Sequence, residues 1–252
     1  MKTQTDIQFS ERLLGALRSA ESVAAFTGAG VSAESGVPTF RGDDGIWKKF
    51  KPEELANFDA FIRNPEIVWE WYSHRQRVVG AVQPNAGHYA LVELEHRCAK
   101  FAVITQNIDN LHRRAGSTTV YELHGNIERN YCISCRKQFS NDEMLMEGKV
   151  PRCDRCGGLV RPDVVWFGEI LPSDQWDAAE RAARDADVFL SIGTSGVVYP
   201  AASLPLIAKR AGAFLVEVNA EPTPLTDYAD EFLMGKSGDV LPRLVEALNE
   251  RG

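Results

Sequence analysis

The sequence contains no apolar run long enough to cross a membrane. Its most apolar stretch, residues 188–208, is interrupted by two glycines and two prolines, whereas a membrane helix needs about 20 consecutive apolar residues. The first eleven residues carry two acidic side chains and lack both an apolar core and an arginine-rich pattern, so we expect no targeting segment there. We therefore expect a cytoplasmic protein in a reducing compartment, with no membrane partner.

An excess of positive charge is also missing. Lysine and arginine number 28 against 35 aspartates and glutamates, which gives a formal net charge of −7 at pH 7. This balance repels phosphate and argues against a nucleic-acid partner. The 252 residues, 44% hydrophobic and 25% charged, suffice for one large domain or two unequal ones with a core that needs no disulfides. The composition excludes fibrous and disordered classes.

Short apolar runs alternate with helix-like patterns along the chain. Four runs are typical of strands buried on both faces of a parallel sheet, and a fifth candidate follows Pro162; they span residues 23–26, 101–104, 188–192, 213–218 and 164–167. Helix-like patterns cover residues 9–20, 65–80, 87–98, 175–185, 200–211 and 240–248. This alternation predicts an α/β fold built on a Rossmann-like, doubly wound parallel sheet.

Two segments do not follow the alternation. Residues 43–86 separate the first two strands by more than one crossover helix, and residues 126–161 are polar and hold four of the five cysteines. We interpret residues 43–86 as a helical insertion and residues 126–161 as a small metal-binding module. The Rossmann-like domain then consists of the remaining segments, residues 1–42, 87–125 and 162–252.

Polar or glycine-rich residues follow each of the five candidate strands. In open α/β sheets, ligands bind beyond the carboxyl ends of the strands. We therefore expect these clusters to line one crevice, which we interpret as the active site; they are residues 27–30, 105–109, 168–169, 193–195 and 219–221.

A glycine-rich turn follows the first strand. Residues 28–33, Gly-Ala-Gly-Val-Ser-Ala, match the pattern that lets a backbone approach a pyrophosphate at a helix N-terminus. A tight turn without a ligand is the alternative. The acidic residue that normally binds a ribose about 20 residues further on is missing, because Asp43 and Asp44 lie in a glycine-rich loop. We therefore expect a dinucleotide to bind in a non-standard way.

The cysteines carry the strongest signal in the sequence. Cys132 and Cys135 form one C-x₂-C pair, Cys153 and Cys156 form another, and 17 residues separate the pairs. Four thiolates suit tetrahedral zinc and leave no position for a catalytic water, so we expect one structural Zn²⁺. Two disulfides or unconnected thiols are the alternative. Cys98 lies on an apolar helix pattern and is expected in the core.

Several polar residues near the strand ends are candidates for chemistry. His124 stands beside a glycine just before the cysteine-rich segment, and histidine suits general-base work near neutral pH. Asn107 and Asp109 either hold a ribose or amide, or cap a helix over residues 111–115. Ser195 similarly either caps the helix that begins near residue 200 or donates to a phosphate.

Taken together, these residues resemble the sirtuins, the NAD-dependent protein-lysine deacylases. The matching segments occur in the family's order and cover about residues 20–248; they are Gly28-Ala-Gly-Val-Ser32, Gly36-Val-Pro-Thr-Phe-Arg41, Thr105-Gln-Asn-Ile-Asp109, Leu123-His-Gly125, the four paired cysteines, Arg161-Pro-Asp-Val-Val-Trp-Phe-Gly-Glu169, Gly193-Thr-Ser195 and Val218-Asn-Ala-Glu221. Each segment is weak alone, and the ordered set is specific.

The resemblance implies that NAD is a co-substrate and that His124 is the general base, with Asn107 beside it in catalysis. It also implies an NAD site formed by Gly28, Ala29, Gly30, Ser32, Thr39, Phe40, Arg41, Trp47, Gln106, Asn107, Ile108, Asp109, Gly193, Thr194, Ser195, Asn219, Ala220, Glu221 and Ser237. The expected partners are acylated-lysine proteins or peptides, and the expected products are nicotinamide, 2′-O-acyl-ADP-ribose and free lysine. The sequence does not predict an oligomeric state.

One departure from the common pattern points to a branch of the family. Thr39 stands where many sirtuins have aspartate, and with Tyr72 and Arg75 it resembles the class III branch, which removes succinyl, malonyl and glutaryl groups. Residues 65–80 are predicted to be helical, so Tyr72 and Arg75 share a face and could bind a carboxylate by charge-assisted hydrogen bonds. A solvated surface pair is the alternative.

Three rival functions remain. A mono-ADP-ribosyltransferase or NAD glycohydrolase would use the same dinucleotide loop and His124 without needing Tyr72 and Arg75. A non-catalytic NAD-sensing zinc module would not need Asn107, Asp109 and His124. A hydride-transfer dehydrogenase is disfavoured by the missing ribose-binding acid and by the closed four-cysteine site.

Overall fold

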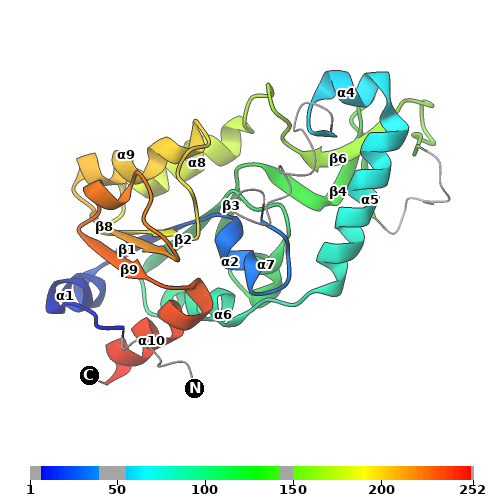
Figure 1. Cartoon of the computed structure of the whole chain (residues 1–252). Coiled ribbons are helices and arrows are strands. Elements are labelled where there is room, and N and C mark those ends of the chain that lie inside the picture. The colour runs from blue at the N-terminus through cyan, green and yellow to red at the C-terminus, as the bar shows by residue number, and fades with distance from the viewer. Residues whose placement is uncertain (1–6, 40–54, 142–149, 251–252) are drawn as a thin grey trace.

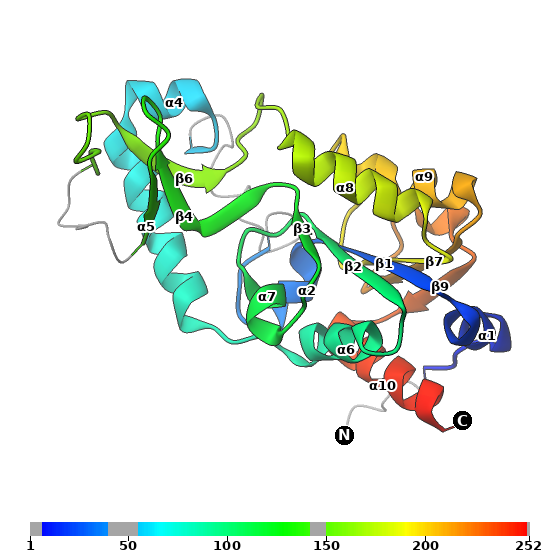
Figure 2. The ribbon, with the colours of Figure 1, turned by 180° about the vertical axis from the view of Figure 1, so that it is seen from behind.

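The computed structural model describes residues 7–39, 55–141 and 150–250. Its larger sheet consists of β1 (Ser22–Thr27), β2 (Lys100–Thr105), β3 (Val120–Glu122), β7 (Val188–Ile192), β8 (Phe214–Asn219) and β9 (Glu231–Met234). These strands are all parallel, in the order β3-β2-β1-β7-β8-β9 (Figures 1 and 2). The strand order reverses between β1 and β7, so the predicted Rossmann-like, doubly wound sheet is confirmed.

Helices cover both faces of this sheet (Figures 1 and 2). One face packs on α1 (Glu11–Ser19), α6 (Ala86–Glu95) and α10 (Ser237–Asn249), and the other on α8 (Ser173–Arg184) and α9 (Leu204–Ala211). Successive residues of β1 alternate between the two cores: Val23 and Ala25 join the first, Ala24 and Phe26 the second. Burial on both faces explains why the strands read as continuous apolar runs.

A smaller antiparallel sheet lies beside the large one. It contains β4 (Gly125–Cys132), β5 (Gln138–Ser140) and β6 (Val160–Val164), in the order β5-β4-β6. The helices α4 (Phe58–Arg63) and α5 (Pro65–Ala81) pack against it and form a third apolar core. The predicted helix over residues 65–80 is confirmed: Pro65 occupies its first turn, and the side chain of Asn64 accepts a hydrogen bond from the Ile67 amide at 3.4 Å.

The fifth predicted strand, residues 164–167, is wrong as a member of the parallel sheet. Val164 is instead the last residue of β6, which pairs antiparallel with β4. Pro162 lies within β6 and is tolerated because β6 is an edge strand of the small sheet. Residues 165–167 continue as irregular chain toward the large sheet.

Several short elements were absent from the sequence expectations. Strand β3 has three residues and β9 four, too few for a recognisable pattern. The short helix considered over residues 111–115 is present as α7 (Leu111–Ala115), and short helices also occur at α2 (Ala29–Ala33), η2 (Ala201–Ser203) and η3 (Thr226–Tyr228). Within the described ranges no helix has the length and apolar character that a membrane span requires.

Main-chain hydrogen bonds join the two sheets around residues 123–127. Leu123 N–H donates to the Thr105 carbonyl at 3.0 Å, and Ile127 N–H donates to the Ile108 carbonyl at 2.8 Å. Gly125, between them, has φ +79°, and a Cβ there would lie 2.1 Å from the carbonyl oxygen of Asp163. Only glycine fits this junction, so the residue that connects the sheets is dictated sterically.

Two buried histidines contact each other beneath the large sheet. His88 on α6 and His112 on α7 have ring centroids 4.9 Å apart, and both rings are almost fully buried. Burial lowers the pKa of His88 to about 4. Burial lowers the pKa of His112 as well, and the neighbouring His88 lowers it further. Both rings are therefore neutral near pH 7.

This neutrality makes folding sensitive to acid. An unfolded histidine takes up a proton near pH 6.5 and the folded His88 only near pH 4, so the stability from its neutral form is present above pH 6.5 and declines toward pH 4. Between pH 7 and 5 the wild type should lose about 2 kcal/mol more than a His88→Gln variant, which retains an acceptor for the helix cap. Denaturant unfolding at both pH values measures this, and equal pH dependence would contradict it.

Candidate active site

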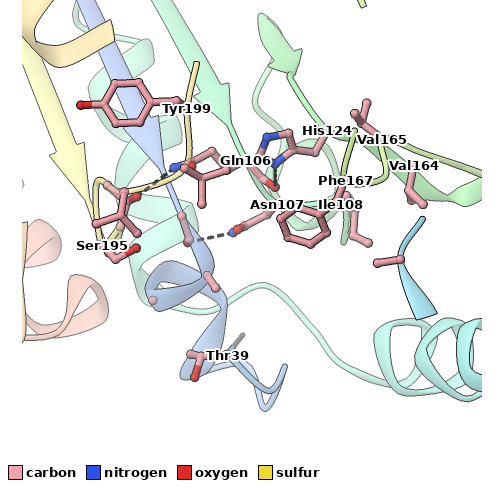
Figure 3. Close-up of a pocket in the computed structure, with 18 of the residues that line it drawn as sticks. Thr39, Gln106, Asn107, Ile108, His124, Val164, Val165, Phe167, Ser195 and Tyr199 are labelled. Atoms are coloured by element: carbon pink, nitrogen blue, oxygen red, sulfur yellow. Dashed lines mark hydrogen bonds between the residues drawn. The ribbon is translucent and has the colours of Figure 1, made fainter. Parts of the chain in front are cut away.

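A cavity of about 770 Å³ lies beyond the carboxyl ends of the parallel strands. Its lining comes from loops that follow strands of both sheets (Figure 3) and from helix α5. All five clusters expected at one crevice contribute lining residues: 28–30, 106–108, 168–169, 193–195 and 219–221. Its volume falls within the range of about 300–1,000 Å³ that is typical of ligand sites.

The glycine-rich turn packs directly against the loop after β7. Gly28 N–H donates to the Ile192 carbonyl at 3.0 Å, and Gly30 N–H donates to the Gly193 carbonyl at 2.8 Å. A Cβ on Gly30 would lie 2.8 Å from that same Gly193 oxygen, so no larger residue fits. Backbone rather than side chain therefore forms the floor of the cavity here.

Amide side chains connect the loops across the cavity. Asn107 is buried, and its Nδ2 donates to the Gly28 carbonyl and to Ser32 Oγ, both at 3.0 Å. Gln106 Nε2 donates to Thr194 Oγ1 at 2.9 Å. These bonds link the loop after β2 to the loops after β1 and β7. Asn107 does not cap α7; its amide faces the glycine-rich turn instead (Figure 3).

Asp109 is also buried but has a different role. Its Oδ1 accepts the Leu111 amide hydrogen at 3.0 Å, at the start of α7. Burial raises the pKa of Asp109, against the lowering effects of a Ser32 hydrogen bond, the Leu111 amide and the charge of Arg75. The expectation that Asp109 holds the start of a helix agrees with this contact. Asp109 also places a carboxyl near Arg75.

His124 lines the cavity at the junction of the two sheets. Its Nδ1 lies 3.0 Å from the Gln106 carbonyl oxygen (Figure 3). Because a carbonyl only accepts, Nδ1 carries the hydrogen and Nε2 is the basic nitrogen. Burial lowers the pKa of His124 below its ordinary 6.5, opposed by the Gln106 hydrogen bond. The neutral ring is therefore the dominant form at pH 7.

Tyr72 and Arg75 lie on the buried face of α5, so a solvated surface pair is excluded. Tyr72 lines the cavity, and its hydroxyl accepts a hydrogen bond from Trp166 Nε1 at 2.7 Å. Burial raises the pKa of Tyr72 to about 12. The Arg75 guanidinium lies 5.0 Å from the ring centroid of Trp71, itself a lining residue. Arg75 is not among the described residues that line the cavity.

The remaining sequence candidates fall into three groups. Thr39, Ser195 and Glu221 line the cavity, as do Ala29, Ile108, Asn219 and Ala220. Ser195 is not the cap of η2 or α9, which begin after Pro200 and Ser203. Ser237 is buried at the start of α10, outside the lining, with Oγ 3.5 Å from a Glu34 carboxylate oxygen. Phe40, Arg41 and Trp47 lie outside the described residues.

An ion pair between the buried Arg161 and the partly exposed Glu169, near the cavity, was not assigned a role from the sequence. Arg161 is 1% exposed and donates to both carboxylate oxygens of Glu169, at 2.5 and 2.9 Å. Its guanidinium lies 3.4 Å from the centroid of the Trp166 ring. Both charged residues occur in the motif of residues 161–169. Their opposite charges, eight positions apart, were the sequence feature from which an ion pair could have been predicted. The pair holds the loop that carries Trp166 and Phe167.

The four paired cysteines cluster at one end of the small sheet. Their sulfur atoms all lie within 4.8 Å of one another, with Cys132 to Cys156 at 3.5 Å and Cys135 to Cys153 at 3.6 Å. Disulfides need about 2.05 Å, so the alternative of two disulfides is excluded. Zinc–sulfur bonds of about 2.3 Å in a tetrahedron place sulfurs about 3.8 Å apart. The cluster therefore fits one tetrahedral zinc ion.

Comparison with known proteins decides the family. The family model described as "Sir2 family" matches residues 28–200. The chain belongs to the Sir2, or sirtuin, family. A protein of Pyrobaculum aerophilum named "NAD-dependent protein deacylase 2" is 54% identical, and the match covers 93% of this chain and 94% of the relative. A protein of Aquifex aeolicus named "NAD-dependent protein deacylase" is 50% identical, with 91% and 96% covered.

Solved sirtuin structures have the same fold. A structure titled as a Sir2 homolog–NAD complex is 48% identical to this sirtuin, with a TM-score of 0.91 and coverage of 97% of this chain and 95% of the other. Another, titled as Sir2 with a p53 peptide and NAD⁺, is 36% identical, with a TM-score of 0.87 and coverage of 96% and 100%. Both alignments extend over nearly the whole of this sirtuin.

The cysteine cluster makes a test of the metal site possible. Cys153→Ser removes one of four ligands, so the purified protein should lose zinc from about one ion per chain and unfold more than about 5 °C earlier. Cys98→Ser is the matched control, because Cys98 packs against the large-sheet core, away from the cluster. Elemental analysis and thermal unfolding measure both effects. Full zinc content in Cys153→Ser would contradict the assignment.

Proposed function

We propose that this sirtuin is an NAD-dependent protein-lysine deacylase that removes acidic acyl groups and, more weakly, acetyl. The observation that carries the proposal is His124: it lines the cavity with Nδ1 on the Gln106 carbonyl, which leaves Nε2 as a base. The products are free lysine, nicotinamide and 2′-O-acyl-ADP-ribose. The names of the relatives, NAD-dependent protein deacylases, support the reaction class.

The loops of the cavity suit a dinucleotide. Main-chain atoms of residues 28–30 pack so closely on Gly193 that no side chain occupies the floor, which suits a pyrophosphate. Asn107, Gln106 and Asp109 would hold the nicotinamide half. Residues 193–195 and 219–221 would hold the adenosine half, on the other side of the turn. Bound NAD supplies a ribose carbon that accepts the acyl oxygen when nicotinamide leaves.

The residues of this chain would then transfer a proton, orient the ribose and exclude water. His124 Nε2 is the atom that takes a proton from a ribose hydroxyl, and the Gln106 carbonyl stabilises the charged ring through Nδ1–H. Asn107 orients the ribose from the loop after β2, where its position is fixed by Gly28 and Ser32. The buried Trp166 would exclude water from the acyl end of the cavity.

Recognition of an acidic acyl group rests on Tyr72 and Arg75. Tyr72 lines the cavity and Arg75 follows it by one turn on the same buried face. A buried guanidinium beside a tyrosine hydroxyl suits a terminal carboxylate. One observation favours a second candidate function, a general deacylase that prefers acetyl: the charge of Asp109 already acts on Arg75. Substrate carboxylate and Asp109 would then compete for the same cation.

The peptide backbone of the substrate is proposed to bind between two loops that line the cavity. Val197 and Tyr199 on one side, and Phe167 on the other, are 46%, 72% and 48% exposed. Extended peptide that pairs with such segments through main-chain bonds gains affinity with little sequence preference. Acylated-lysine proteins or peptides are therefore the proposed partners.

Matched succinyl-lysine and acetyl-lysine peptides test the proposal. We expect NAD-dependent nicotinamide release and deacylation with both, and a higher kcat/KM with succinyl. Arg75→Met removes charge-assisted hydrogen bonds and should raise the KM for the succinyl peptide at least about tenfold while sparing the acetyl peptide. The exposed Arg77 on the same helix gives the control Arg77→Met, which should change neither value.

Each other outcome selects a different function. A preference for acetyl, with equal loss on both peptides in Arg75→Met, supports the second candidate and removes Arg75 from acyl recognition. Nicotinamide release without deacylation of either peptide supports an ADP-ribosyltransferase or NAD glycohydrolase. No NAD consumption at all supports the non-catalytic NAD-sensing module.

The pH profile tests His124 separately. Because burial lowers its pKa below 6.5, the basic form persists to lower pH than in a free histidine, and kcat/KM should fall only below an inflection under pH 6.5. The acetyl peptide is the substrate to use, since its acyl group does not titrate. An acid limb centred above pH 6.5, or none, would contradict His124 as the base.

A further inference from the structure

A buried row of hydrogen bonds runs behind the cavity, from α7 to the loop after β2. His112 Nε2 lies 2.9 Å from Thr27 Oγ1, and Thr27 Oγ1 lies 2.9 Å from Thr105 Oγ1. Thr105 Oγ1 accepts the main-chain amide hydrogen of Asn107 at 3.0 Å. All four residues are less than 9% exposed. The row therefore ends on the residue proposed to orient the ribose.

The two threonines occupy equivalent places in neighbouring strands. Thr27 ends β1, Thr105 ends β2, and the two are paired in the parallel register. The glycine-rich turn begins directly after Thr27, and Asn107 follows Thr105 by two residues. A contact between these hydroxyls thus fixes the spacing of two loops at the point where both leave the sheet.

The direction of each bond follows from the donors available. The Asn107 amide and the Thr27 hydroxyl both donate to Thr105 Oγ1. The Thr27 hydrogen is then committed, so Thr27 Oγ1 accepts from His112, and Nε2 carries the ring hydrogen. The opposite tautomer would place a hydrogen on Nδ1, which is buried with no hydrogen-bond partner in the described part of the chain.

Burial holds His112 in the neutral form. Its pKa is lowered well below 6.5, first by burial and then by the nearby His88. A neutral ring has a single N–H to donate, and Thr27 is the partner that it reaches. The donor at the end of the row therefore stays the same around neutral pH.

We propose that His112 is a positioning residue: through Thr27 and Thr105 it fixes the main chain of Asn107, whose side chain then bridges Gly28 and Ser32. The kinetic consequence rests on the proposed function, because it requires Asn107 to orient the ribose of NAD. The structural consequence, a looser main chain at Asn107, does not depend on the proposed function. Loss of the row should loosen Asn107 while leaving the acyl end of the cavity, which belongs to the other sheet, unchanged.

Paired variants separate the hydrogen bonds from packing. Thr27→Val keeps the shape and deletes the hydroxyl, whereas Thr27→Ser keeps the hydroxyl and deletes a methyl group. His112→Phe removes the donor, and His112→Gln retains an N–H at a similar reach. Ser191→Ala is the matched control, since Ser191 Oγ on the neighbouring β7 is buried with no hydrogen-bond partner in the described ranges.

Three readouts decide the outcome. Nitrogen NMR of the ring should find His112 with its hydrogen on Nε2. Amide hydrogen exchange at Asn107 should become about tenfold faster in Thr27→Val and His112→Phe, and remain near wild type in Thr27→Ser, His112→Gln and Ser191→Ala. The KM for NAD should rise about tenfold in the first two variants, with the peptide KM unchanged.

Contrary results are equally clear. A hydrogen on Nδ1, or unchanged Asn107 exchange in Thr27→Val despite a lower Tm, would overturn the positioning role and leave His112 as a packing residue. Equal rises in both KM values would overturn it as well. If the wild type shows no NAD-dependent reaction, the proposed function fails, and the tautomer and exchange readouts still decide the role of His112.

Discussion

The close approach of two backbone turns is the constraint on which the site depends. Gly28 and Gly30 donate to the chain at Ile192 and Gly193, which closes the gap between the loops after β1 and β7. A side chain at Gly30 would collide with Gly193, so the floor of the cavity consists of peptide groups. Those groups lie where the strand order reverses, the place in such sheets where helices diverge and a ligand can enter.

A second junction brings His124 to this floor. His124 lies between β3 of the large sheet and β4 of the small one, and main-chain bonds on both sides hold it there. Glu122, two residues earlier, is buried and accepts hydrogen bonds from Arg129 and Asn126, both on β4. The hydrogen bonds of Glu122 and the main-chain bonds together therefore keep the small sheet in place. The position of His124 depends on that arrangement.

The sequence predicted well those features that arise from local patterns. Continuous apolar runs such as residues 23–26 indicated buried parallel strands, and Cys132 and its three partners indicated a metal cluster before any geometry was known. It failed at residues 164–167, because an apolar run alone does not show which sheet a strand joins. The row of hydrogen bonds from His112 to Asn107 could not be predicted from the sequence either. The register of β1 and β2, and not a spacing along the chain, places Thr27 beside Thr105.

Desolvation governs the charges around the cavity. Burial lowers the pKa of Arg75 and His124 and raises that of Tyr72 and Asp109, so each of these groups is pushed toward its neutral form. At Arg75, the neighbouring Tyr72 and then Asp109 oppose that lowering. An acyl carboxylate entering beside Tyr72 would bring a second anion to the same guanidinium. The proposed selectivity for acidic acyl groups would therefore depend on how the Arg75 guanidinium is shared between the substrate carboxylate and Asp109, not on the presence of an arginine alone.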